Sequence, residues 1–470
     1  MRRFANAGTR TTLGKDVLMA KAALLHKLAV SMCAATRSTD LLARWTGAAP
    51  FLPALFVLRY ANMGGLDTAV FARQVRGARS FRDDRWCSYW NPIASGYARR
   101  ATDLLSSLAG TDSATVPDLT KPNAATAADN IDGLTAWIAP AAVLFADHGP
   151  QPDTGALAAI VEAHAPADDR ERITLALSAI DAWVKAITYY QVSAFPGHGP
   201  HRIQAYWRSR HLFDALAAAL VPALGLTVQR VEVPLAGGEA VRGYLIVPPG
   251  SGPHPVVLTT NGLEGTVQEL AIPQLRYRDS GMAMFLMEMP GSYAYTDPMS
   301  PKSEEVDHQV VGHLAADQRL DANRIAMVGV SFGGYWTARL AATSDRLACA
   351  IACGAPTHRS FHGSALGTPQ VILHALAKTV GAAHPIDLVG KLRALSIRNL
   401  YPQITIPLLV INGDHDTLMS TQDSCDLAHA ATNATLLLYP DDDHCAMGHY
   451  RQWLDYSQRW LLKHLTMARA

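Results

Sequence analysis

A serine at position 331 lies in a sequence pattern that is typical of a nucleophile. Residues 329–333 read Gly-Val-Ser-Phe-Gly, which is the pattern G-x-S-x-G. An apolar run of strand type precedes it at 324–328, and a helix-like segment follows at 334–342. On a sharp turn from strand to helix, small neighbours relieve crowding and the hydroxyl projects at a helix N-terminus that favours negative charge. The pattern also arises by chance in glycine-rich chains, but this context indicates a serine able to attack an acyl carbon.

A nucleophilic serine needs a base that accepts its proton, and histidine is the side chain most often used. In the arrangement expected for such a turn, the base follows the last strand. The apolar run 435–439 ends at Pro440, and three aspartates lead from it to His444. We therefore expect His444 to be the base, whereas His449 falls in the final helix, where a structural role is expected. The three aspartates form a solvated acidic turn or stabilise the charged imidazole.

The reaction also needs N–H groups where negative charge develops on the substrate oxygen. One donor is expected to be the backbone N–H of Phe332, directly after the serine. The other should come from the loop after the strand 255–260, which reads Asn-Gly-Leu-Glu-Gly. Gly262 and Leu263 are both candidates, and the sequence does not separate them because either would donate through its backbone. An ordinary glycine-rich turn is the alternative for this loop.

The elements that must position these residues are short apolar strands alternating with helix-sized segments. Two strands flank Gly237-Gly238 as in a hairpin, and six more follow; the predicted strands are 228–234, 240–247, 255–260, 282–287, 324–330, 347–353, 407–412 and 435–439. Continuous apolar strands separated by helices predict a mostly parallel sheet covered on both faces. Eight strands with a serine turn after the fifth are the α/β-hydrolase arrangement. The long interval 358–401 is expected to add a helical lid.

The α/β-hydrolase arrangement places the acid that orients the histidine after the strand 407–412, in the chain order serine, acid, histidine. The turn that follows this strand is Gly413-Asp414-His415-Asp416. Asp416 has a Gly-x-x-Asp spacing that resembles other α/β-hydrolases, and we expect it to be the acid. Asp414 is the alternative, although a turn residue bonding its own backbone also explains it.

The first half of the chain is predicted to be helical. Apolar residues recur near helical spacing in 127–146, 168–190 and 201–224, and proline- and glycine-rich stretches separate these segments. The pattern changes to strands near Gly225. We therefore expect a helical N-terminal or cap domain over 1–225 and a catalytic domain over 226–470.

Composition restricts the class of protein. The 470 residues are 49% hydrophobic and 17% charged, as in a globular protein with an ample core, and a net charge of +1 gives no reason to bind nucleic acid. The six cysteines form no C-x-x-C pair, and charged residues interrupt the apolar segment 17–33. Neither a disulfide framework nor a secretory signal is predicted. We expect an amphipathic helix at 17–33, no stable membrane insertion and a cytoplasmic location.

Three motifs resemble the FrsA-like branch of the α/β-hydrolases. They are the loop at 261–265, Met-Pro-Gly-Ser at 289–292, and the serine turn with the start of its helix at 331–336. The resemblance reaches from about residue 168 to the C-terminus; one departure is Glu288, where many relatives have an aspartate. Members of this branch carry a helical domain ahead of the hydrolase domain, and the resemblance is consistent with a homodimer. It implies no metal and no organic cofactor.

The resemblance implies hydrolysis through an acyl-enzyme, with Ser331 as nucleophile, His444 as base and acid, and Asp416 as orienting acid. It fits cleavage of an ester or thioester, and equally cleavage of a carbon–carbon bond beside a ketone in a β-diketone-type substrate, as in fungal relatives that shorten polyketides. Residues near the predicted active-site loops are candidates for binding a small aromatic or polyketide-like substrate, with core packing or an ordinary loop position as the alternative: Glu264, Tyr293, Tyr335, His358 and Arg359.

Two other functions stay open on this fold, because a fold does not fix a function. An acyltransferase or cyclase would use the same three residues with an acceptor other than water. A non-catalytic protein that binds a ligand or a partner would need none of them.

Overall fold

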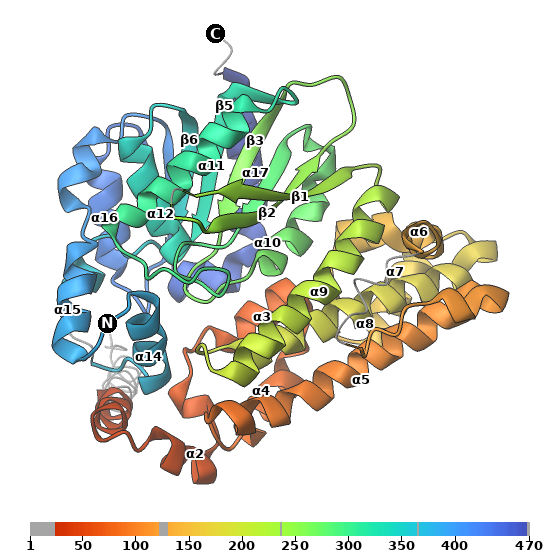
Figure 1. The fold of residues 1–470 in the computed structure, drawn as a ribbon, viewed down its shortest axis with the longest axis horizontal. Coiled ribbons are helices and arrows are strands. Elements are labelled where there is room, and N and C mark those ends of the chain that lie inside the picture. Colours follow the sequence, from red (N-terminus) through yellow and green to blue (C-terminus); the bar gives the residue numbers. More distant parts are fainter. Residues whose placement is uncertain (1–23, 122–129, 236, 364–365, 468–470) are drawn as a thin grey trace, which may run out of the picture.

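The structure is a computed structural model that describes residues 24–121, 130–235, 237–363 and 366–467. The first half of the chain is helical, as predicted, and the second half is a sheet with helices (Figure 1). After a helical segment at 24–36, the helices before the sheet are α2 (Thr39–Thr46), α3 (Phe56–Gly64), α4 (Thr68–Gly77), α5 (Asp83–Ala109), α6 (Ile131–His148), α7 (Thr154–His164), α8 (Arg170–Ala194) and α9 (Pro200–Ala223). The segments expected at 127–146, 168–190 and 201–224 correspond to α6, α8 and α9, and residues 127–129 and 17–23 lie outside the described residues.

Eight strands form one sheet in the order β1-β2-β4-β3-β5-β6-β7-β8. The first two form the predicted antiparallel hairpin, β2 pairs antiparallel with β4, and all other neighbours are parallel. Their bounds are β1 (Thr227–Pro234), β2 (Ala240–Val247), β3 (His254–Thr260), β4 (Ala283–Met287), β5 (Leu320–Val330), β6 (Leu347–Cys353), β7 (Leu408–Gly413) and β8 (Ala434–Tyr439). This is the mostly parallel α/β-hydrolase sheet that the sequence predicts.

Helices cover both faces of the sheet. Strand side chains alternate between its two sides, and apolar side chains on both sides must be buried. Helices after β3 that contact its strands are α10 (Val267–Gln274), α11 (Glu304–Ala316), α12 (Phe332–Thr343), α16 (Thr421–Ala430) and α17 (Tyr450–Met467). Three more helices lie in the segment between β6 and β7, namely α13 (Arg359–His362), α14 (Gln370–Thr379) and α15 (Pro385–Ala394). Along β5, Ile325 and Met327 belong to the core that includes α11 and α12, whereas Ala326 and Val328 belong to the core that includes α17. The continuous apolar strands are therefore a consequence of burial on both faces.

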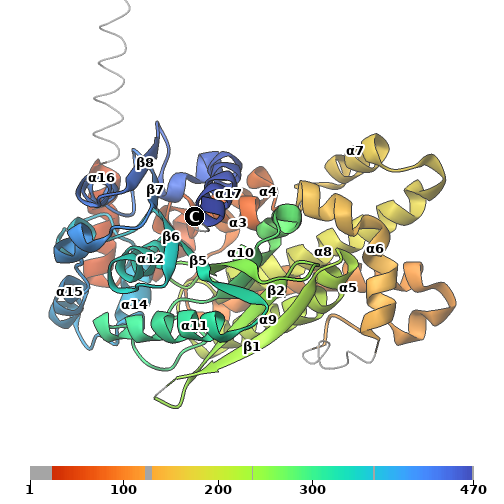
Figure 2. The same ribbon diagram turned by 90° about the horizontal axis from the view of Figure 1, so that it is seen from above.

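Helix α8 is the centre of the helical half and packs against α5, α6 and α9. Two buried indole groups join these helices through hydrogen bonds: Trp183 Nε1 donates to Leu212 O at 3.0 Å, and Trp86 Nε1 donates to Val192 O at 3.0 Å. Buried indoles need such acceptors, because an unpaired N–H in the core is costly. In both ribbon views α6 and α7 lie at one end of the molecule and α14–α16 at the other (Figures 1 and 2).

Helix α3 lies between the helical half and the sheet, where it contacts α8, α10 and the 3-10 segment His444–His449. Asn62 donates to the backbone oxygen of Met447 at 2.8 Å, and the Arg59 guanidinium pairs with Glu269 at 2.8 Å. The bond from Asn62 to Met447 joins residues that are 385 positions apart in the chain.

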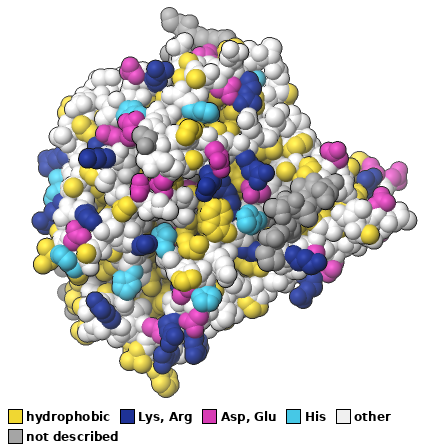
Figure 3. All heavy atoms as spheres, viewed as in Figure 1, with side chains coloured by type: hydrophobic (Ala, Val, Ile, Leu, Met, Phe, Trp, Pro, Cys, Tyr) yellow, Lys and Arg dark blue, Asp and Glu magenta, His cyan; other side chains and the backbone are white. Residues whose placement is uncertain are grey.

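Charged side chains of both signs are interspersed on the face seen in Figure 3, and no patch of a single sign dominates it. Within the described ranges, no helix combines the length and the apolar character needed to cross a bilayer.

Candidate active site

Ser331 occupies a sharp turn between β5 and α12. Its backbone has φ 58° and ψ −121°, a conformation that is rare for a residue with a side chain. The Ser331 N–H donates to Cys353 O on β6 at 2.7 Å, and its carbonyl oxygen accepts from Tyr335 N within the following helix. These bonds hold the strained turn, and Ser331 lies on the wall of a pocket.

Glycines make this turn possible because the backbone segments around it are in close contact. A Cβ atom on Gly329 would overlap the carbonyl oxygen of Gly333, and one on Gly333 would lie 2.5 Å from Thr260 O. A Cβ atom on Gly262 would lie 2.6 Å from the Cβ of Ser331. The G-x-S-x-G pattern thus reflects packing of β5, α12 and the loop after β3, in addition to the turn itself.

The structure brings Ser331, His444 and Asp416 together. His444 Nε2 lies 2.9 Å from Ser331 Oγ, and His444 Nδ1 lies 2.8 Å from Asp416 Oδ2. An ionised carboxylate only accepts hydrogen bonds, so Nδ1 carries the proton and Nε2 is free to accept the proton of Ser331. The His444 and Asp416 side chains are 3% and 0% exposed, so water does not compete for these contacts.

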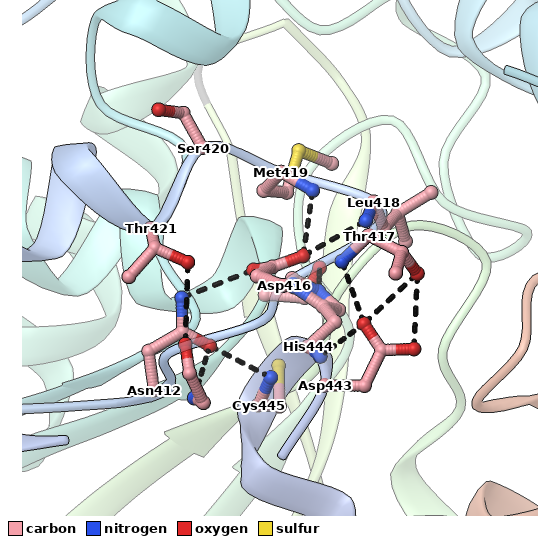
Figure 4. A network of polar contacts seen from close by, with 12 residues as sticks. Asn412, Asp416, Thr417, Leu418, Met419, Ser420, Thr421, Asp443, His444 and Cys445 are labelled. Atoms are coloured by element: carbon pink, nitrogen blue, oxygen red, sulfur yellow. Dashed lines mark hydrogen bonds and ion pairs between the residues drawn. The ribbon is translucent and has the colours of Figure 1, made fainter. Parts of the chain in front are cut away.

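Hydrogen bonds hold Asp416 as a charged carboxylate (Figure 4). Its Oδ1 accepts from the backbone N–H groups of Leu418 and Met419 at 2.9 and 2.7 Å, and its Oδ2 accepts from Asn412 Nδ2 at 3.0 Å. Burial raises the pKa of Asp416, but His444 and these donors outweigh it and keep the pKa below its ordinary value. Burial likewise lowers the pKa of His444, and Asp416 outweighs it and raises that pKa above its ordinary value.

The aspartates before His444 shape its loop. Asp443 Oδ1 accepts from the His444 N–H at 2.8 Å and from Thr417 N at 2.6 Å, which ties the histidine loop to the turn that carries Asp416. Asp442 accepts from the backbone and ring of His449, with 2.7 Å to Nδ1. The alternative acid, Asp414, instead accepts from Asp441 N at 2.8 Å and contacts the ring of its neighbour. Geometry therefore separates Asp414, a loop-forming residue, from Asp416.

The N–H groups of the loop after β3 differ in whether they already have an acceptor. The N–H of Gly262 already donates to the side chain of Asn261 at 2.8 Å, whereas the N–H of Leu263 has no acceptor among the described residues. The N–H of Phe332, at the start of α12, likewise has none. The described residues thus leave the N–H groups of Leu263 and Phe332 without an acceptor, and the lack of a side chain at Gly262 lets the loop pass Ser331.

The pocket in front of Ser331 has a volume of about 710 Å³, its open mouth included. Apart from Ser331, His444, Arg59 and Asn261, its lining is almost entirely apolar; the apolar side chains are Pro53, Leu55, Phe56, Met63, Phe195, Leu263, Val330, Ile372, Leu376, Leu418, Met419, Cys445 and Met447. Helix α3 and the residues before it supply one wall, which sequence reasoning missed because nothing local in that stretch indicates a partner so distant in the chain. From the expected lid at 358–401, only α14 contributes described residues to the lining.

The residues expected to bind substrate lie outside this lining. Tyr293 donates to Ala194 O at 3.0 Å, and Tyr335 is fully buried beside Phe332 and Phe361. Glu264, in the loop after β3, has a buried side chain whose carboxylate accepts from Gly197 N at 2.7 Å. Burial raises the pKa of Glu264 to about 7.

His358 and Arg359 are also absent from this lining, and they lie on α13 and the residue before it. His358 Nδ1 lies 2.8 Å from Ser396 Oγ, and Arg359 forms an ion pair with Asp426 at 2.6 Å. Their position after a strand predicts access to the site. Instead, Arg359 pairs with a residue of α16, and His358 bonds a residue just after the end of α15.

Comparison with known proteins gives the family. The sequence profile of the esterase FrsA-like family matches residues 165–466. This chain belongs to that family. FrsA-like relatives include hydrolase LUC6 from Fusarium sp, 30% identical over 42% of this chain and 49% of its own length, and 2,6-dihydropseudooxynicotine hydrolase from Paenarthrobacter nicotinovorans, 26% identical over 57% of this chain and 72% of its own length.

Solved structures similar to this FrsA-like chain have the same fold. The crystal structure of the 2,6-dihydroxy-pseudo-oxynicotine hydrolase aligns with a TM-score of 0.55 and 21% identity over 70% of this chain and 95% of its own. AbyA5 aligns with a TM-score of 0.54 and 22% identity over 67% of this chain and 90% of its own. The match spans about half the length of LUC6 and of esterase FrsA from Enterobacter sp. (strain 638). Fold and hydrolase family agree with the resemblance seen in the sequence.

Proposed function

We propose that this protein is a serine hydrolase that acts through an acyl-enzyme. The observation that carries the proposal is the chain of contacts from Ser331 Oγ to His444 Nε2 at 2.9 Å and from His444 Nδ1 to Asp416 Oδ2 at 2.8 Å, on the wall of an apolar pocket. A ligand-binding protein needs no such chain of groups. Membership of a family of esterases and hydrolases supports the same conclusion.

Each residue has one role in the proposed mechanism. His444 accepts the hydroxyl proton as Ser331 Oγ attacks the substrate carbonyl carbon, and Asp416 stabilises the imidazolium that forms. The N–H groups of Phe332 and Leu263 receive the oxyanion of the tetrahedral intermediate. His444 then protonates the leaving group, and water, activated by the same histidine, releases the acid from Ser331.

The apolar pocket lining favours a substrate that is largely apolar. Thirteen apolar side chains surround the serine, including Phe56 and Phe195, and they match an aliphatic or aromatic acyl compound better than a sugar or a peptide. Ester, thioester and β-diketone-type substrates all satisfy this requirement, since they share the attacked carbonyl.

Labelling with a fluorophosphonate tests the nucleophile. We expect intact-mass spectrometry to find one adduct on the wild-type protein and none on Ser331→Ala, because only an activated serine reacts readily with this reagent. The matched control is Ser360→Ala, which removes a hydroxyl outside the pocket lining and should still be labelled. Labelling of Ser331→Ala, or none on the folded wild type, would reject the assignment.

Product analysis separates hydrolysis from acyl transfer. With an ester substrate and an excess of alcohol or amine acceptor, a hydrolase releases mainly the free acid, whereas a transferase or cyclase forms mainly the new ester or amide. Dominant transfer product would replace the hydrolase proposal by the transferase alternative on the same three residues.

A further inference from the structure

Arg59 is the one arginine or lysine in the described lining of the pocket that holds Ser331. It lies on α3, and its side chain is 13% exposed. Removing an ionised side chain from water is costly, so a partly buried cation on an apolar wall calls for a reason. One reason is structural, because the ion pair with Glu269 attaches α3 to α10. That pairing uses only one side of the guanidinium.

The guanidinium is held firmly on one side. Nε and Nη2 donate to the Glu269 carboxylate at 2.8 and 2.9 Å, and Nη2 also lies 3.5 Å from Glu264 O in the loop that follows the donor Leu263. The Arg59 Cζ lies 5.3 Å from the ring centroids of both Tyr60 and Phe195. Planar bidentate pairing and flanking rings fix the orientation of an arginine before any substrate binds.

The remaining nitrogen, Nη1, is not used by these contacts. Among the described residues it has no hydrogen-bond acceptor, although it belongs to a side chain on the pocket wall. Burial lowers the pKa of Arg59, but Glu269 outweighs it and holds the pKa above its ordinary value, so the donor stays charged. A fixed, charged arginine on the wall of an apolar pocket, with one nitrogen not used by these contacts, is suited to a substrate oxygen that carries or develops negative charge.

We propose that Arg59 binds the second carbonyl oxygen of a β-diketone substrate, the oxygen that becomes an enolate when the carbon–carbon bond breaks. This inference rests on the proposed acyl-enzyme function and names the substrate class of that site. A simple ester has no such need, because His444 protonates its leaving oxygen directly. In a diketone the leaving group is a carbon atom, and its negative charge is delocalised onto a carbonyl oxygen away from the bond that breaks. That oxygen needs a donor of its own.

The step balances without any further reagent. Ser331 Oγ bonds to one carbonyl carbon while His444 takes its proton, and collapse of the tetrahedral intermediate moves the electrons of the carbon–carbon bond into the enolate. Arg59 stabilises the enolate oxygen, and His444 returns the proton to the enolate carbon, which gives a ketone. Water then releases the acyl group as a carboxylic acid, so that diketone and water give ketone and acid.

Two substrates with the same acyl group test the proposal: dibenzoylmethane, a diketone, and phenyl benzoate, an ester. We expect Arg59→Met to lower kcat/KM for dibenzoylmethane by roughly 10²–10³-fold, as for loss of one preorganised donor to a developing oxyanion. The same variant should change kcat/KM for phenyl benzoate much less. Arg59→Lys should recover part of the diketone activity, because it restores a cation without the bidentate pairing.

Arg278→Met is the matched control. Arg278 is also mostly buried, with a side chain 10% exposed, and pairs with Asp147 at 2.7 Å, but it lies outside the pocket lining. Its loss should leave the ratio of the two kcat/KM values unchanged. Melting curves of all three variants, and fluorophosphonate labelling of each, establish that the fold and the nucleophile remain intact.

The outcomes separate this inference from the function on which it rests. Equal losses on ester and diketone in Arg59→Met would assign Arg59 a purely structural role and overturn the inference. Cleavage of phenyl benzoate with none of dibenzoylmethane by the wild type would also overturn it and leave the serine hydrolase intact. Absence of fluorophosphonate labelling would instead reject the proposed function itself. If Arg59→Met fails to fold, a diketone-to-ester ratio in Arg59→Lys equal to that of the wild type overturns the inference.

Discussion

At the scale of single residues, the candidate site depends on which group holds each proton. Burial would by itself raise the pKa of Asp416 and lower that of His444, which would favour the neutral pair. Their mutual attraction reverses both directions, and the Met419 N–H and the Asn412 side chain lower the pKa of Asp416 further. Asp416 therefore stays charged, and the pKa of His444 lies above its ordinary value.

The pH dependence of Asp416→Asn tests this coupling. A base acts only when neutral, so wild-type kcat/KM for an ester should be high above the raised pKa of His444 and fall as pH decreases through it. Asparagine removes the charge that raises this pKa, so the acid limb should move to lower pH. The maximal rate should drop by about 10⁴-fold, because the amide also favours the wrong imidazole tautomer.

Asp414→Asn is the control for that experiment, since Asp414 lies in the same turn and bonds Asp441 N instead of His444. Its pH profile should match the wild type. A profile of Asp416→Asn with an unmoved acid limb, or an equal effect of both substitutions, would contradict the role assigned to Asp416.

At the level of secondary-structure elements, packing against other elements stabilises the strained turn from β5 into α12. Ser331 holds a positive φ because Cys353 on β6 accepts its N–H and because Gly329 and Gly333 leave room for the neighbouring backbone. Burial of the two flanking elements, with Val330 and Phe332 both buried, stabilises the turn that exposes the hydroxyl.

Gly329→Ala should destabilise the protein and reduce fluorophosphonate labelling. The new methyl group would overlap the backbone of Gly333, which must then move away from Ser331. We expect urea denaturation to show a loss of about 1–3 kcal/mol, as for overpacking of a core.

Gly312→Ala is the matched substitution, because a Cβ atom in that helix would contact nothing within 4 Å. Alanine has the better helix propensity, so this variant should gain up to about 1 kcal/mol and keep full labelling. Equal stabilities of the two variants would show that the close approach at Gly329 is not as described.

At the scale of the whole molecule, the helical half and the sheet share the candidate site. One continuous hydrophobic core runs from Ala48 in the helical half to Ala431 beyond α16. Buried polar contacts also cross the junction, among them the ion pair of Arg210 on α9 with Glu288 after β4, 3.3 Å apart. The domain division at residue 225 remains a prediction, and these contacts indicate that the two parts stabilise one another.

We therefore expect the protein to unfold in a single transition. Circular dichroism at the helix band and tryptophan fluorescence should give coincident curves in urea, because the shared core couples both halves. The fragment 226–470 alone should lose the pocket wall formed by α3 and fail to react with fluorophosphonate. Two separated transitions, or a well-folded and reactive fragment, would instead show that the sheet region is independent of the helical half.

Features that depend on a few neighbouring positions could be predicted from the sequence. Continuous apolar strands, helical periodicity and the glycine-flanked Ser331 each reflect the backbone within a few positions, and the FrsA-like motifs fall in the same stretches. These signals predicted the eight-stranded sheet and the helical half, and chain order with motif spacing pointed to Asp416 and His444. Their convergence follows from parallel strands, whose carboxyl ends meet at one edge of a sheet.

Which side chains line the pocket could not be predicted without the packed fold. Tyr335, expected at the site, is buried among neighbouring rings, whereas Arg59 and Phe56 reach the pocket from a helix that precedes the sheet by more than 150 positions. The proposal of Leu263 rather than Gly262 as oxyanion donor also depends on a contact, the hydrogen bond that the Gly262 N–H donates to the Asn261 side chain. Pocket walls depend on how whole elements pack, and such long-range contacts leave no periodic signal along the chain.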